Sequence, residues 1–66
     1  MKRLEINPEV YSLESVEKAC QVYQGLARIA VKKKANRIII TFVNCKYDAD
    51  RTVKEFENYL IGIENL

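Results

Sequence analysis

Residues 38–43, IIITFV, constrain the fold more than any other stretch, because they predict a strand that is apolar on both faces. Alternation along a strand divides them into two sets: Ile38, Ile40 and Phe42, and Ile39, Thr41 and Val43. A strand with two largely apolar faces belongs at the centre of a sheet. The sequence therefore predicts a sheet built around this strand.

The rest of the chain is typical of two more strands and two helices. Leu4 and Ile6 alternate with Arg3 and Glu5, which is the period of a strand with one buried face. Proline after Asn7 ends this strand because it lacks a backbone N–H. The predicted elements are a strand at about 2–7, a helix at about 12–25, strands at about 27–33 and 37–45, and a helix at about 49–64.

The first helix carries signals at both ends. Ser12 is a candidate N-cap, and Glu14 places a negative charge in the first turn, where the helix dipole favours it. Gly25 is the expected C-terminal stop. From the helix start onward, apolar residues recur at three- and four-residue steps, so the helix is amphipathic. They are Leu13, Val16, Cys20, Tyr23 and Ala27, with Ala19 and Leu26 on the flank.

The second helix has the same character. Asp48 or Asp50 can cap it. Its apolar stripe consists of Val53, Phe56, Leu60 and Ile63.

The two later strands are joined by a short polar connection. Ile29 and Val31 are expected on the buried face of the strand that precedes it. Asn36 in the connection is able to adopt the left-handed conformation. These features predict a hairpin.

Short connections determine how the elements are arranged. A right-handed crossover through the first helix makes the first two strands parallel, and the hairpin makes the third antiparallel to the second. If the third strand lies between the others, in the order 1-3-2, every neighbouring pair is antiparallel. The sequence thus predicts an α+β fold. It is a single β-α-β-β-α domain over residues 1–66, with both helices on one face of a three-stranded antiparallel sheet.

Such a fold leaves one sheet face without a helix. That face has a small apolar centre inside a charged rim, to which Arg3 and Glu5 belong, and this is the usual anatomy of an interface. We expect it to bind a partner or to form a homodimer. The candidate interface residues are Arg28, Ala30, Lys32, Ile39, Thr41 and Val43. The alternatives are that these residues reflect only strand propensity, or that the helices straddle the sheet.

Consecutive lysines at the hairpin allow a second interpretation, which is a nucleic-acid contact. The residues concerned are Lys32, Lys33, Lys34 and Arg37. Lysines at a hairpin more often solvate the loop and protect a sheet edge from aggregation. No aromatic residue adjoins them to stack on bases, and a net charge of +2 is too small to attract polyanions by itself. These features disfavour nucleic acid as the partner.

The sequence offers no catalytic constellation. It has no histidine, no glycine-rich phosphate loop and no nucleophile beside an evident base, so we expect no enzymatic activity and no catalytic residue. Cys20 and Cys45 form no CxxC pair, which predicts reduced, partly buried thiols, no metal site and no cofactor. No apolar run is long enough to cross a bilayer, which favours a cytoplasmic protein.

The small size of the chain bears on its oligomeric state. A domain of 66 residues has a small core, so self-association would remove further apolar surface from water. We therefore expect a homodimer. A third interpretation is an orphan structural domain whose apolar face does nothing but form that dimer.

Two segments together resemble the HxsD-like family. They are VYSLESVEKACQVY, residues 10–23, and KEFENYL, residues 54–60. In that family a tyrosine-hydrophobic-glutamate helix start precedes an alanine-rich helix, and a phenylalanine-asparagine-glutamate-leucine motif lies in the last helix. The matching residues are Tyr11, Leu13 and Glu14, and Phe56, Asn58 and Leu60; Tyr59 stands where the family tends to have glutamate.

The resemblance, which spans Ile6 to Leu60, implies a role rather than a reaction. It implies an accessory protein of the bacterial His-Xaa-Ser system, in which radical S-adenosylmethionine (SAM) enzymes act on a precursor peptide. The family's small protein has no assigned catalytic residues, so none is carried over. The resemblance makes the precursor peptide and the radical-SAM maturase candidate partners, held at the open face or by strand addition at an edge.

Overall fold

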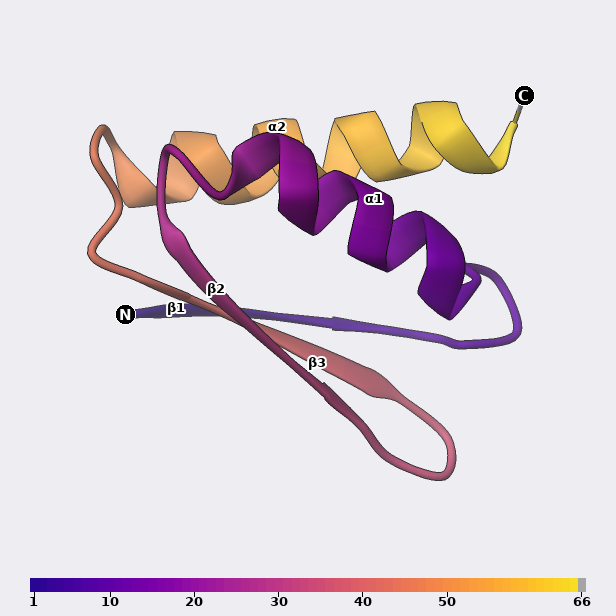
Figure 1. Cartoon of the computed structure of the whole chain (residues 1–66). Helices are drawn as coiled ribbons and strands as arrows, with labels where there is room; N and C mark the ends of the chain where they lie inside the picture. The colour runs from indigo at the N-terminus through magenta and orange to yellow at the C-terminus, as the bar shows by residue number, and fades with distance from the viewer. Residues whose placement is uncertain (66) are drawn as a thin grey trace.

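The computed structural model describes residues 1–65 and contains a three-stranded sheet and two helices (Figure 1). The elements are β1 (Lys2–Ile6), α1 (Leu13–Tyr23), β2 (Arg28–Lys33), β3 (Ile38–Val43) and α2 (Ala49–Glu64). β3 lies between β1 and β2, and both pairs are antiparallel. The predicted α+β fold with strand order 1-3-2 is confirmed. Leu66, the last residue of the predicted domain, lies outside the described residues.

The central strand alternates strictly between buried and half-buried residues. Ile38, Ile40 and Phe42 are completely buried, because both helices lie on the same side of the sheet (Figure 1). The register places Ile6 opposite Ile38 and Leu4 opposite Ile40, so β1 contributes to the same apolar layer. The alternation read from the sequence therefore separates a covered face from an open one.

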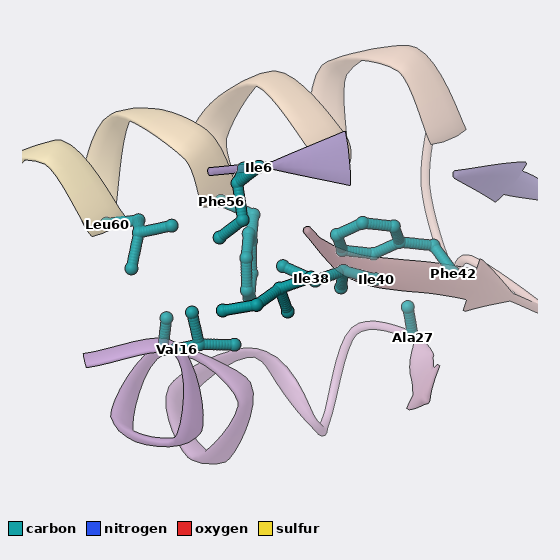
Figure 2. Packing of buried hydrophobic residues seen from close by; sticks show 9 residues of the cluster. Ile6, Val16, Ala27, Ile38, Ile40, Phe42, Phe56 and Leu60 are labelled. Atoms are coloured by element: carbon teal, nitrogen blue, oxygen red, sulfur yellow. The ribbon is translucent and has the colours of Figure 1, made fainter. Parts of the chain in front are cut away.

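Phe56 of α2 is the centre of the core. Its ring meets the ring of Phe42 edge-to-face at a centroid distance of 5.1 Å and that of Tyr23 at 5.6 Å. Such pairs add to the stability that burial of the rings provides. Leu60 from α2 and Val16 from α1 point into the same layer (Figure 2). Both helices are thus held to the sheet through one continuous apolar cluster.

Side-chain caps fix the start of each helix. The Ser12 hydroxyl accepts the Ser15 backbone N–H at 3.2 Å, as the N-cap of α1. The Asp48 carboxylate accepts the Asp50 N–H at 3.0 Å, and the Thr52 hydroxyl donates to the Asp48 carbonyl at 2.9 Å. Each cap satisfies backbone groups that a helix start leaves unpaired. Of the two candidate aspartates for α2, the cap is therefore Asp48.

α1 ends at Tyr23 with Gln24 as its C-cap, so the stop expected at Gly25 lies one residue after the cap, without a positive φ. The Leu26 N–H closes this turn by donating to the Tyr23 carbonyl at 2.9 Å. The left-handed residue is Asn44, with φ of 55°, and not Asn36. Because that conformation turns the chain away from the sheet, β3 ends at Val43.

Val31 also departs from expectation. Its side chain was predicted to be buried with Ile29, yet 37% of it is exposed. α2 lies against β1, and the hairpin formed by β2 and β3 extends beyond both helices (Figure 1). β2 therefore has little cover on either face.

Candidate functional site

The structure brings the six candidate interface residues together on the sheet face opposite the helices. The register pairs Arg28 with Val43, Ala30 with Thr41, and Lys32 with Ile39. Directly paired residues in an antiparallel sheet point to the same face. The three β3 members are half-buried and the three β2 members are exposed. The face thus has an apolar ridge along β3, flanked by cations along β2.

The other flank of the ridge is formed by β1. Arg3 lies opposite Thr41 and Glu5 opposite Ile39. The Glu5 carboxylate lies 3.4 Å from the Arg3 guanidinium and 3.2 Å from that of Arg37. These exposed ion pairs contribute little to stability, but they place a carboxylate beside the Arg3 and Arg37 cations. The β2 flank keeps the uncompensated charges of Arg28 and Lys32.

The basic hairpin does not form one patch. Lys32 pairs with Ile39 on the open face, whereas Lys33 pairs with Ile38 and therefore points to the helix side of the sheet. Arg37 is engaged by Glu5. The side chains proposed for a nucleic-acid contact are thus distributed over two faces, and one of them already has an anionic partner.

A hollow of about 390 Å³ lies at the other end of the molecule, where α1 ends and α2 begins. Tyr23, Leu26 and Tyr47 form its apolar walls. Tyr47 lies outside both helical stripes and was not among the predicted site residues. An exposed aromatic residue in the loop before α2 was the sequence feature that could have pointed to it.

The polar groups around this hollow make structural contacts. The Tyr23 hydroxyl donates to the Glu55 carbonyl at 3.2 Å, and Arg51 forms an ion pair with the Glu55 carboxylate at 3.1 Å. Burial, reinforced by Glu55, raises the pKa of Tyr23. A raised pKa disfavours the phenolate form of Tyr23, and its hydroxyl is engaged by the backbone of α2.

Both thiols are free and partly buried. Burial, and to a lesser degree the charge of Glu17, raises the pKa of Cys20, which disfavours the reactive thiolate. Within residues 1–65, no group of three or more Cys, Asp or Glu side chains is placed so that it could hold a metal ion. The helices of this part of the chain are too short or too polar to cross a membrane.

Comparison with known proteins identifies a family. No curated protein and no solved structure matches the chain. The family model of the His-Xaa-Ser system protein HxsD matches residues 6–64, from the last residue of β1 to the last of α2. The resemblance found in residues 10–23 and 54–60 is thereby confirmed. The chain belongs to the HxsD family of His-Xaa-Ser system proteins, and this membership indicates an accessory role in that system.

Proposed function

We propose that this HxsD-family chain is a non-enzymatic accessory module in the radical-SAM-linked maturation of a ribosomally made peptide in the cytoplasm. Its contribution is binding. Two copies associate through their open sheet faces, and the homodimer presents its edges to the precursor peptide or to the maturase.

The observation that carries the proposal is a sheet with helices on one side only. Ile39, Thr41 and Val43 line the uncovered side as a ridge that neighbouring side chains bury only in part. Covering such a ridge removes apolar surface from water, which is the main favourable term in association. A chain of 66 residues has few other ways to add buried surface.

The self-association is tested by light scattering over a series of protein and salt concentrations. Val43→Lys places a charge at one end of the ridge without touching the covered core. Val22→Lys is the matched control, because Val22 is 56% exposed on α1, away from the open face. A dimer that tolerates salt, is lost in Val43→Lys and is retained in Val22→Lys supports the proposal.

A chain that is monomeric at every concentration overturns the self-association. The precursor peptide and the maturase are then titrated separately into the ¹⁵N-labelled chain. Chemical-shift changes at Ile39 or Val43 would keep the open face as a partner site, whereas no change with either ligand would contradict the accessory role at this face. Binding to an oligonucleotide that weakens steeply with salt would favour the nucleic-acid interpretation instead.

A further inference from the structure

The outer edge of β2 is a strand edge with its backbone hydrogen-bonding groups turned outward. The Lys34 N–H donates to the Arg37 carbonyl at 2.8 Å, so this pair belongs to the hydrogen-bonded set of the hairpin. Hydrogen-bonded and non-hydrogen-bonded pairs alternate along an antiparallel ladder. The register therefore assigns Ile29, Val31 and Lys33 to the set whose N–H and C=O groups face away from β3.

The same edge carries a row of cations. Arg28, Lys32, Lys33 and Lys34 lie on or directly after β2 and are exposed. Within residues 1–65, the ion pairs of the structure involve none of these four side chains. Each of them is therefore available to an anionic group on another molecule.

The opposite edge of the sheet differs in both respects. α2 lies against β1, and the β1 cations are already matched: Lys2 lies 2.7 Å from Asp50, and Arg3 lies 3.4 Å from Glu5. The outer edge of β2 is therefore the one that α2 does not cover and whose cations, within the described residues, have no carboxylate beside them.

We propose that the outer edge of β2 binds an extended acidic peptide segment as a fourth strand. This inference rests on the proposed function, since it gives the chemistry of the peptide that the accessory module would hold. Strand addition of this kind gains its affinity from main-chain hydrogen bonds and its specificity from alternating side chains. A second copy of β2 is a poor occupant because it would set cations opposite cations, which destabilises a strand pair.

The alternation along β2 predicts the pattern of the bound segment. Positions opposite Arg28 and Lys32 lie on the open face beside those cations and favour Asp or Glu. Positions opposite Ile29 and Val31 lie on the helix side, where Val31 is exposed, and favour apolar residues. The preferred ligand therefore alternates acidic and apolar residues.

The probe is a short synthetic peptide in which glutamate alternates with valine, flanked by Gly-Ser. One control peptide has the same composition in two blocks, and another replaces glutamate with lysine. Binding of the alternating peptide should slow amide exchange at Ile29, Val31 and Lys33 by on the order of tenfold. Exchange at Ala30, whose N–H faces β3, should not change.

Two variants separate strand addition from simple charge attraction. Val31→Pro removes an outward N–H but no bond to β3, so it should keep the fold and lose the protection. Lys32→Glu leaves the backbone intact and should shift the preference toward the lysine peptide.

Three results would overturn the inference. They are binding without protection of the outward amides, equal affinity for the blocked peptide, and preference for a short oligothymidylate over the acidic peptide. If the peptide fails while the dimer is still lost in Val43→Lys, this inference fails and the proposed self-association stands.

Discussion

The backbone N–H of Ser12 and the carboxylate of Glu64 are 52 positions apart in the sequence and 2.7 Å apart in the structure. The Ser12 hydroxyl lies 3.0 Å from the same carboxylate oxygen. The last residue of α2 therefore closes the N-terminus of α1, where the helix dipole favours a negative charge. The hydrogen bond from the Ser12 backbone, followed by those from the Ser15 and Ser12 hydroxyls, lowers the pKa of Glu64.

This contact predicts a pH-dependent contribution to stability. A carboxyl group whose pKa is lower in the folded state stabilises the fold above its unfolded pKa, and this contribution is lost as pH falls through the folded pKa. Glu64→Gln should thus lower the urea midpoint at neutral pH, and the difference from wild type should shrink below the ordinary glutamate value of 4.5. Urea unfolding followed by circular dichroism at several pH values measures it. A difference that is the same at pH 3 and pH 7 would show that the charge of Glu64 is not involved.

Replacing either glycine with alanine should stabilise the folded protein. A methyl group added at Gly25 or Gly62 meets no atom within 4 Å, and neither residue has a positive φ. Gly62 lies inside α2, where alanine is favoured over glycine by about 1 kcal/mol. Gly25→Ala should add about 0.4–1 kcal/mol by restricting the unfolded chain. Thermal unfolding of the two single variants measures both gains, and a lower midpoint for Gly25→Ala would mean that its turn needs glycine after all.

Replacing Asn44 with alanine should instead destabilise the folded protein. At a φ of 55°, the Cβ atom crowds the following carbonyl oxygen, which costs about 1–2 kcal/mol. Glycine has no Cβ, and the short polar side chain of Asn or Asp can offset this cost with a local hydrogen bond. Asn44→Ala should therefore destabilise the fold by about this amount, and Asn44→Gly should not. Asn36→Ala is the matched control because Asn36 is an exposed loop asparagine without a positive φ. Equal denaturant midpoints for the Asn44→Ala and Asn36→Ala variants would contradict the assignment of strain.

Truncation of Phe56 should cause the largest loss of folding stability. Truncation of a fully buried phenylalanine to alanine costs about 3–5 kcal/mol, which is close to the whole stability expected for a core of this size. Phe56→Ala should be largely unfolded at 25 °C in far-UV circular dichroism, whereas Lys54→Ala, exposed on the same helix, should fold like wild type. A folded Phe56→Ala variant would mean that the cluster around Phe42 and Tyr23 can close over the cavity.

The sequence pattern predicted what depends on local periodicity. The two faces of residues 38–43 determined the central strand, and Ser12 was recognisable as a cap from its residue type and position. The candidate interface followed from the same alternation, because the register of an antiparallel sheet carries it across strands.

Three features depend on the lengths of the elements and on the course of the chain between them, and the sequence pattern did not predict them. Val31 has the spacing of a buried residue, but its exposure depends on how far the helices reach over β2. The contact between Glu64 and Ser12 depends on the length and direction of α2. Asn36 and Asn44 both occur in loops, and only the course of the chain after β3 decides which of them is left-handed.

The strand order has a consequence for the timing of folding. β1 and β2 each pair with β3, and β3 follows both of them in the sequence. As the chain leaves the ribosome, the first two strands and α1 are therefore complete before either strand has a partner to pair with. The hairpin with β2 then closes over a short loop, while β1 must close over more than thirty residues, from Ile6 to Ile38. β1, α1 and β2 are thus synthesised before the sheet has its central strand, and the sheet can form only after Ile38 to Val43 have left the exit tunnel.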